Sequence, residues 1–350
     1  MNILRNDIYI KSLSNMLDEI DISYLQGKTL LISGAYGMIG SCIVDALMLW
    51  NNKQTNPCKI ITVGRDEMKA KKRFQNYYYS DKFEFYCHDI CEELADIINK
   101  TDYIIHAASN ADPVNISRKP VDTLLANILG TNNLLKYGIG HDMQRFMYVS
   151  SGEMYGEPDD KMNDFNEKYC GYIDYSSPRS CYPSGKRGAE VLCKSYISQH
   201  NVNAVIVRPC HIFGPTMTEN DSRAVSEFFK NAVKNKKIIL KSSGAIERSH
   251  CYVIDAIKAI FIVLQRGLCG EAYNIADKTY QMTIKDFATS IAKASGSVIE
   301  FADPSEIEKA GYSKVKRSVL SNDKLRYLGW IPNKNRNAIV ETIKILEKEC

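Results

Sequence analysis

The chain has 350 residues, of which 45% are hydrophobic and 25% charged, as in ordinary globular proteins of one or two domains. Its net charge of +4 is too small for this length to call for nucleic acid or an anionic membrane as a partner. The most apolar run, residues 259–264, is too short to span a bilayer. Residues 1–7 lack the pattern of a signal peptide, so we expect a cytoplasmic protein.

The cysteines do not form a recognisable framework. There are eleven, an odd number, and none forms a Cys-x-x-Cys pair. Cys87 and Cys91 flank His88, but no second ligand group of matching spacing follows. We therefore expect reduced thiols and no metal site.

The first 28 residues place apolar side chains at helical spacing, which predicts an amphipathic helix packed on the domain behind it. Strand-like and helical segments then alternate. The strand-like runs are residues 29–33, 59–63, 82–86, 103–107 and 145–150; the helical ones are 39–50, 67–78, 92–99, 121–137 and 184–199. This alternation predicts an α/β fold, a doubly wound parallel sheet covered by helices on both faces.

A glycine-rich loop joins the first strand to the first helix of this pattern. Gly34, Gly37 and Gly40 follow the strand directly, and Met38 and Ile39 lie where the helix opens. Glycine permits a tight turn and close approach of the backbone to a pyrophosphate, and the helix amino terminus favours negative charge. The Gly-x-x-Gly-x-x-Gly spacing resembles the extended short-chain dehydrogenase/reductases, which implies a Rossmann-type domain that binds a nicotinamide dinucleotide.

The residues after the next three strands bear on that cofactor. Gly64 precedes Arg65 and Asp66: an acid there would bind the ribose of NAD+, whereas arginine suits the 2′-phosphate of NADP+. The resemblance favours NAD+, and Arg65 leaves NADP+ open. The resemblance also places two pairs against the cofactor, namely Asp89 with Ile90 and Ala107 with Ala108.

Tyr182 and Lys186 have the Tyr-x-x-x-Lys spacing, which puts both side chains on one face of a helix. A nearby cation favours the phenolate, so tyrosine can act as a base. Three other pairs share the spacing: Tyr24 with Lys28, Tyr78 with Lys82, and Tyr312 with Lys316. Only Tyr182 opens a long helix after a strand that ends in serines, so we assign the catalytic role to Tyr182 and Lys186.

Ser151 and Glu153 follow that strand. The hydroxyl of Ser151 is suited to bind the sugar oxygen that tyrosine deprotonates. Glu153 resembles the glutamate of enzymes that also act at the sugar C5–C6 bond, namely the 4,6-dehydratases and glucuronate decarboxylases. Gly152 lies between them, at the position where the thymidine-nucleotide dehydratases carry an aspartic acid. The absence of this acid weakens a 4,6-dehydratase function more than it weakens a decarboxylase function.

Several stretches resemble the UDP-glucuronate decarboxylase (UDP-xylose synthase) branch of the NAD-dependent epimerase/dehydratase family. They lie at residues 108–113, 167–171, 178–187, 213–226, 247–253 and 328–330. The resemblance implies that Ser109, Arg223 and Arg248 bind the nucleotide sugar, since a guanidinium fork matches phosphate or carboxylate oxygens. It also implies a homodimer and a role in polysaccharide biosynthesis.

The predicted organisation is thus a helical extension (residues 1–28), a dinucleotide-binding domain (29–208), and a smaller α/β unit (209–350) that mainly binds the nucleotide sugar. Some of its segments are expected to return to the first domain. The predicted enzyme oxidises the sugar at C4 transiently and then decarboxylates it. A 4,6-dehydratase or an epimerase is the alternative, and a non-catalytic dinucleotide-binding regulator is an alternative of another class.

Overall fold

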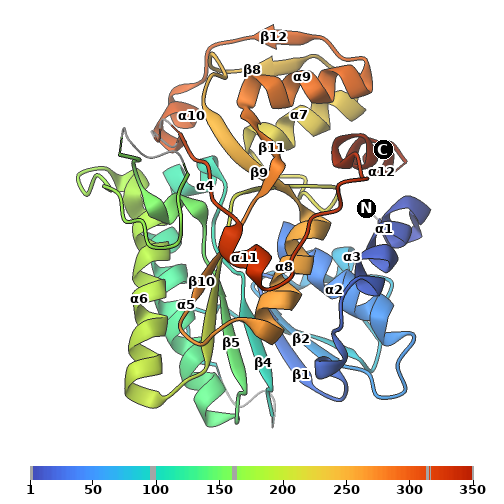
Figure 1. Cartoon of the computed structure of the whole chain (residues 1–350), viewed down its shortest axis with the longest axis vertical. Coiled ribbons are helices and arrows are strands. Elements are labelled where there is room, and N and C mark those ends of the chain that lie inside the picture. Colours follow the sequence, from blue (N-terminus) through green and yellow to red (C-terminus); the bar gives the residue numbers. More distant parts are fainter. Residues whose placement is uncertain (1–2, 95–99, 160–163, 313–314, 316, 349–350) are drawn as a thin grey trace.

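The computed structural model describes residues 3–94, 100–159, 164–312, 315 and 317–348, and its central element is a seven-stranded sheet (Figure 1). The strand order is β3-β2-β1-β4-β5-β6-β10, and every neighbouring pair is parallel. The strands are β1 (Thr29–Ser33), β2 (Lys59–Gly64), β3 (Phe83–Cys87), β4 (Tyr103–His106), β5 (Arg145–Val149), β6 (Ala204–Pro209) and β10 (Ala272–Ile275). The predicted Rossmann-type doubly wound sheet is confirmed. Its order reverses between β1 and β4, where such sheets bind ligands.

Helices cover both faces of this sheet because its strands alternate their apolar side chains between two cores. Leu30 and Ile32 face the core that contains α2 (Met38–Asn51) and α8 (Val253–Arg266). Leu31 faces the opposite core, with α5 (Pro120–Gly140) and α6 (Cys181–His200). Helix α3 (Glu67–Arg73) follows β2, and α1 (Asp7–Asp18) packs on α2 and α8.

The remaining elements lie mainly beyond the carboxyl ends of the strands, at the top of Figure 1. A three-stranded sheet has the order β11-β9-β7, and a two-stranded parallel sheet pairs β12 with β8. Their bounds are β7 (His211–Phe213), β8 (Ile238–Leu240), β9 (Glu247–Tyr252), β11 (Asp277–Thr283) and β12 (Ile299–Phe301). The other helices are α4 (Pro113–Arg118), α7 (Ala224–Val233), α9 (Ile284–Ser295), α10 (Glu306–Gly311), α11 (Asp323–Tyr327), α12 (Ala338–Glu347) and the 3-10 turns η1 (Ile3–Arg5), η2 (Ser23–Leu25), η3 (Gly152–Tyr155) and η4 (Pro178–Ser180). Strand β10 and helix α8, from the second half of the chain, return to the large sheet.

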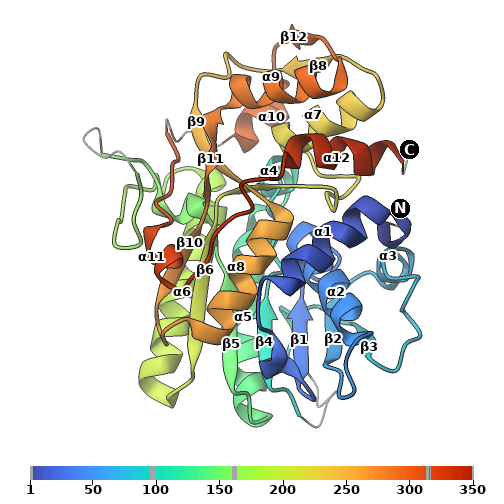
Figure 2. The same cartoon turned by 45° about the vertical axis from the view of Figure 1, so that its right-hand side comes forward.

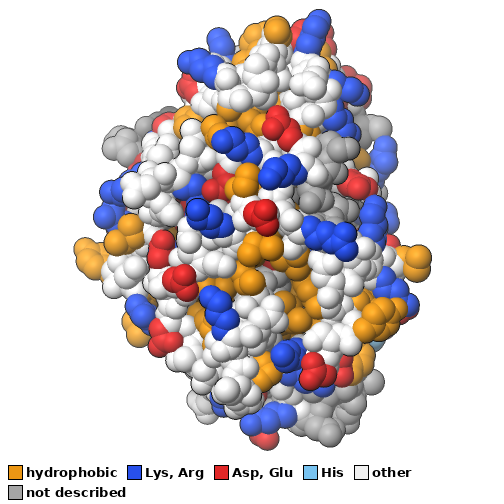
Figure 3. Space-filling model, turned by 90° about the vertical axis from the view of Figure 1, so that its right-hand side faces the viewer, with side chains coloured by type: hydrophobic (Ala, Val, Ile, Leu, Met, Phe, Trp, Pro, Cys, Tyr) orange, Lys and Arg blue, Asp and Glu red, His pale blue; other side chains and the backbone are white. Residues whose placement is uncertain are grey.

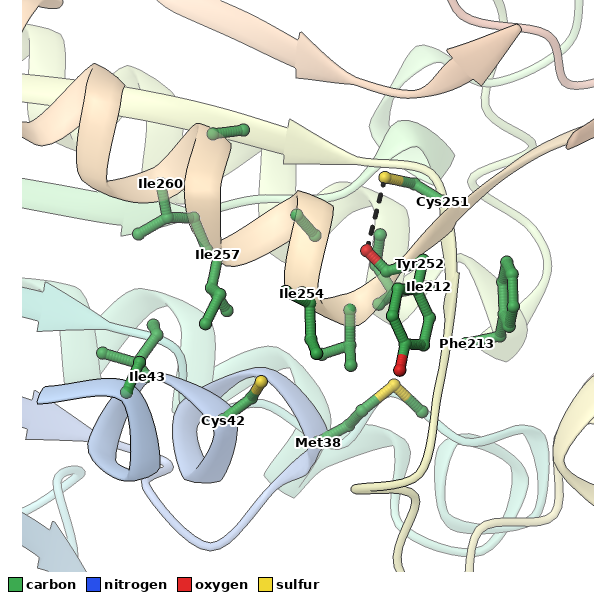
Figure 4. Close-up of a cluster of buried hydrophobic side chains, with 14 of the residues drawn as sticks. Met38, Cys42, Ile43, Ile212, Phe213, Cys251, Tyr252, Ile254, Ile257 and Ile260 are labelled. Atoms are coloured by element: carbon green, nitrogen blue, oxygen red, sulfur yellow. Dashed lines mark hydrogen bonds between the residues drawn. The ribbon is translucent and has the colours of Figure 1, made fainter. Parts of the chain in front are cut away.

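The contact between α2 and α8 ties the glycine loop to the second half of the chain (Figure 4). Ile254 and Ile257 of α8 lie toward Cys42 and Ile43 of α2 in one buried cluster. Tyr252, at the end of β9, is fully buried in the same cluster. The helix that follows the glycine loop is therefore held by elements more than 200 residues away in the sequence.

The amino-terminal helix α1 is part of this core. Tyr9 is fully buried and donates a hydrogen bond to Asp45 of α2 (2.8 Å). Asp45 also forms an ion pair with Arg73 at the end of α3. Ser12 donates to Glu341 of α12 (2.6 Å), so the two ends of the chain lie side by side, as Figure 2 shows. The predicted packing of this helix on the domain behind it is confirmed.

Two predicted helices were wrong in extent, and a third begins earlier than predicted. The helix predicted for residues 67–78 ends at Arg73, because Phe74 and Tyr77 turn inward and pack on Phe83, with ring centroids 5.0 and 5.3 Å apart. Of residues 92–99, Glu92 forms a bend, residues 93 and 94 have no regular structure, and 95–99 lie outside the described part of the chain. Helix α6 begins at Cys181, three residues before the predicted start, so Tyr182 lies in its first turn.

The distribution of charged side chains on the surface agrees with the small net charge of the chain. On the face shown in Figure 3, basic and acidic side chains are intermixed. Within the described residues, no helix is long and apolar enough to cross a membrane, and no group of three His, Cys, Asp or Glu side chains could hold a metal ion.

Candidate active site

The glycine loop forms a cradle that side chains would fill. Gly34 has a φ of 73°, and a Cβ added to it would lie 2.6 Å from the backbone nitrogen of Ala108. A Cβ on Gly40 would lie 2.4 Å from the carbonyl oxygen of Gly34. Gly37 caps α2 with extended backbone, leaving the helix amino terminus open to the cleft. These contacts fit the close approach that a dinucleotide pyrophosphate requires.

The end of β4 packs beneath this loop. The Oγ of Ser33 lies 2.7 Å from Nδ1 of His106, and the backbone N–H of Ala108 donates to the same hydroxyl (3.4 Å). Burial lowers the pKa of His106 to about 3, so its ring is neutral. His106 thus holds the loop against Ala107 and Ala108, which line the cleft.

Tyr182 and Lys186 are both buried at the start of α6. The Lys186 ammonium donates to the carbonyl oxygen of Val149 (2.8 Å) and lies 5.8 Å from the centroid of the Tyr182 ring. Burial raises the pKa of Tyr182 to about 12, the Glu153 charge adds to this, and a hydrogen bond with Ser151 opposes it. Burial lowers the pKa of Lys186 to about 7. The predicted residues Ser151, Tyr182 and Lys186 are thus brought together at the carboxyl end of β5.

Glu153 is paired with a residue that the sequence motifs did not single out. Its carboxylate forms an ion pair with Arg179 (2.7 Å), and both side chains are largely buried. Arg179 belongs to the stretch at residues 178–187 that carries the family resemblance, and this position was its only signal. The ion pair fixes the direction of the Glu153 carboxylate, which lines the cleft.

The two predicted substrate arginines differ in their surroundings. Arg223 lines the cleft and forms a bidentate ion pair with Asp221 (2.5 Å). Arg248 is buried, and no carboxylate forms an ion pair with it within the described residues. Its Nη1 lies 3.4 Å from Nε2 of His211, which must accept the hydrogen bond because a guanidinium only donates. Burial keeps the pKa of His211 well below its ordinary value. His211 also lines the cleft, and no sequence motif pointed to it.

One cleft of about 960 Å³ joins these features at the carboxyl ends of the large sheet. The predicted residues that line it are Gly34, Gly37, Met38, Ile39, Gly40, Arg65, Asp89, Ile90, Ala107, Ala108, Ser109, Ser151, Glu153, Tyr182, Lys186 and Arg223. Asp66 and Arg248 are not among its lining residues. Asp66 instead caps α3 by accepting the backbone N–H of Lys69 (3.0 Å).

The low pKa of Lys186 gives a prediction about stability. Between about 7 in the folded chain and 10.5 in the unfolded chain, the unfolded chain binds more protons, so the free energy of unfolding rises with pH. From pH 7 to pH 9, wild type should therefore gain about 1–3 kcal/mol relative to Lys186→Met. Chemical denaturation of both nucleotide-free proteins at the two pH values measures this gain. An unchanged difference would contradict a buried lysine with a lowered pKa.

A known family covers most of the chain, including the glycine loop and the residues predicted to be catalytic. Residues 30–276 match the model of the NAD dependent epimerase/dehydratase family. The chain belongs to the NAD-dependent epimerase/dehydratase family. The family resemblance seen in the sequence is thereby confirmed.

Curated relatives of the chain include two vertebrate proteins named UDP-glucuronic acid decarboxylase 1. The one from Danio rerio is 30% identical over 343 residues, covering 94% of this chain and 77% of that protein. The one from Xenopus tropicalis is 32% identical over 282 residues, covering 80% of this chain and 63% of that protein. The chain thus spans slightly less than two thirds of the frog protein.

Solved structures with the same fold include an epimerase and a dehydratase. UDP-glucuronic acid 4-epimerase from Bacillus cereus, in complex with UDP-glucuronic acid and NAD, has a TM-score of 0.77 at 20% identity and covers 92% of this chain and 100% of its own. The dTDP-glucose 4,6-dehydratase DesIV from Streptomyces venezuelae, with NAD bound, has a TM-score of 0.76 at 20% identity, covering 91% and 97%. Since an epimerase and a dehydratase fit equally well, the fold alone does not distinguish the reactions.

Proposed function

We propose that the chain is a nucleotide-sugar enzyme that oxidises C4 transiently and decarboxylates UDP-glucuronate or a close analogue. The observation that carries this proposal is the convergence of Ser151, Tyr182, Lys186 and Glu153 on one cleft beside a glycine cradle. A non-catalytic dinucleotide-binding regulator would not need these four groups. The names of the curated relatives support decarboxylation, and the NAD in similar solved structures supports NAD+ as cofactor.

The cradle and cleft fit a nicotinamide dinucleotide, with Gly34, Gly37 and Gly40 against the pyrophosphate and Lys186 at the nicotinamide end. When bound, such a cofactor would accept and return hydride at the sugar C4. In the absence of a cofactor the pKa of Tyr182 is about 12. Lys186 and the positive charge of a bound nicotinamide would favour its phenolate form.

Tyr182 then removes the proton of the 4-hydroxyl, and Ser151 donates a hydrogen bond to the same oxygen. The resulting 4-keto acid carries its C6 carboxylate β to the ketone. The C5–C6 bond breaks, carbon dioxide leaves, and the electron pair moves to the 4-oxygen, where Tyr182 and Ser151 stabilise the charge. Glu153, held by Arg179, assists protonation of C5. An enzyme that catalyses this series of steps is a lyase.

Gly152 favours decarboxylation over dehydration of the thymidine-nucleotide type. A Cβ on Gly152 would lie 3.0 Å from Cδ1 of Leu320, a buried side chain. An aspartate at this position would compete with Leu320 for space. Epimerisation is the second candidate, because it needs only the oxidation step and the return of hydride to C4.

The reaction is tested by incubating the purified protein separately with UDP-glucuronate, dTDP-glucose, GDP-mannose and a CDP-sugar, and measuring product masses. Loss of carbon dioxide from UDP-glucuronate is expected. Loss of water would identify a dehydratase and unchanged mass with altered stereochemistry an epimerase, and either would overturn decarboxylation. Absence of turnover on every nucleotide sugar would favour the regulator.

We also propose a homodimer formed through α5 and α6. Leu125 and Leu129 lie one helical turn apart on α5 and are 39% and 38% exposed, and Val191 of α6 is 61% exposed. Replacing Leu125 and Leu129 together by lysine should convert a two-chain particle to a single chain in sedimentation experiments, because charges would enter an apolar interface. Val298→Lys, on an exposed apolar residue elsewhere, should leave the particle unchanged. A single-chain wild type would contradict the dimer.

The ten cysteines of the described residues are all free, which supports a reducing, cytoplasmic location. A role in polysaccharide biosynthesis is part of the same proposal, since the family resemblance implies it.

A further inference from the structure

The cleft has an unusual adenosine end, defined here by the lining residues Arg65, Lys69 and Asp89 beyond β2 and β3. In doubly wound folds, an acid near the end of the second strand binds the ribose hydroxyls of NAD+. Here β2 ends in Gly64, and a Cβ on it would lie 2.6 Å from Cε1 of Tyr36. The Tyr36 hydroxyl accepts the backbone N–H of Arg65 (3.2 Å), which holds the ring there. An aromatic ring therefore occupies the space that a side chain on Gly64 would need.

The next acid along the chain is committed elsewhere. Asp66 accepts the backbone N–H of Lys69 (3.0 Å) as the amino-terminal cap of α3, and its other oxygen pairs with the Lys69 ammonium (3.2 Å). Its side chain does not line the cleft. Turning it toward a ribose would break the cap, which costs about 1 kcal/mol.

Basic side chains dominate this end instead. The segment that follows β2 contributes four basic residues to the cleft lining, namely Arg65, Lys69, Lys72 and Arg73, and the acids Asp89 and Glu219 also line the cleft. Arg73 is held by the buried Asp45, but Arg65 is 57% exposed and only 3.5 Å from Asp89. Exposed ion pairs of this kind contribute little to stability. Arg65 and Lys69 can therefore leave their carboxylate partners and bind a phosphate, which forms stronger charge-assisted hydrogen bonds.

We propose that the adenosine end binds a 2′-phosphorylated dinucleotide, NADP+, at least as tightly as NAD+, with Arg65 and Lys69 on the 2′-phosphate. The proposal rests on the dinucleotide binding proposed above. The guanidinium fork of Arg65 matches the phosphate oxygens, and the phosphate gains charge-assisted hydrogen bonds that a plain ribose cannot make. The site offers no carboxylate at the end of β2 to bind the ribose hydroxyls of NAD+. NAD+ therefore loses the contact that normally favours it over NADP+.

Calorimetric titration of the full chain, freed of bound nucleotide, with NAD+ and NADP+ in parallel tests this. The dissociation constant of NADP+ should equal that of NAD+ or lie below it. Weaker binding of NADP+ than of NAD+ would overturn this inference and leave the proposed function intact. If neither nucleotide binds, both fail.

Two variants assign the effect to the site. Arg65→Ala should raise the ratio of the NADP+ to the NAD+ dissociation constant on the order of ten-fold, because one charge-assisted phosphate contact is lost. Lys71→Ala is the matched control, since Lys71 carries the same charge on α3 but pairs with Glu67 (2.8 Å) and does not line the cleft. Its ratio should match wild type. An unchanged ratio in Arg65→Ala would overturn the role of Arg65.

Discussion

Tyr182→Phe is expected to lower kcat on the nucleotide sugar by about 10³-fold, because general base catalysis by a positioned side chain contributes about 10²–10⁴. The variant loses only the hydroxyl that removes the 4-hydroxyl proton, and its ring still fills the buried site beside Lys186. Substrate and dinucleotide affinities should therefore change little. Product formation followed by mass, with affinities measured by titration, separates the two effects.

Tyr78→Phe provides the matched control. Tyr78 has the same spacing to a lysine, but its hydroxyl pairs with Glu67 (3.2 Å) on the surface and does not line the cleft. Its kcat should equal that of wild type. A Tyr182→Phe enzyme with more than about a tenth of wild-type kcat would show that another group is the base.

Glu153→Gln is expected to lower kcat for decarboxylation by about 10²-fold, while KM changes less than about five-fold. Glutamine keeps the shape and one acceptor oxygen, but it cannot exchange a proton with C5, and it replaces the ion pair with Arg179 by a neutral hydrogen bond. Steady-state kinetics with UDP-glucuronate measures both constants. Because the tyrosine pair is untouched, the oxidation step is expected to survive.

Glu157→Gln, four residues further on and outside the cleft, controls for loss of charge in the same segment. It should retain wild-type kinetics. If Glu153→Gln decarboxylates at the wild-type rate, the glutamate has no part in the chemistry after oxidation, and its contact with Arg179 is structural.

Local patterns predicted the sheet and the residues nearest to it. Residues 29–33 form β1 as predicted, since a short apolar run before glycines has few other conformations in an α/β chain. Tyr182 and Lys186 were identifiable because four-residue spacing on a helix fixes their shared face. Each of these signals is contained within a few consecutive residues.

The partners of the charged side chains were not predictable in this way. The sequence around Asp66 is compatible with two roles, capping a helix or binding a ribose. In the structure Asp66 caps α3. The pairing of Arg179 with Glu153 joins positions 26 residues apart, and the contact of Arg248 with His211 joins two strands of a different sheet. Such choices depend on which segments meet in three dimensions, and residue type alone does not encode this.

Helix α1 has a consequence for where the folding unit begins. The family match starts at residue 30, but Tyr9, Leu13 and Met16 are buried, and Tyr9 is a partner of the buried Asp45. A polypeptide trimmed to the family boundary would leave a carboxylate short of a hydrogen bond and an apolar strip of α2 and α8 open to water. The segment that matches the family model is therefore shorter than the segment that the chain needs to fold.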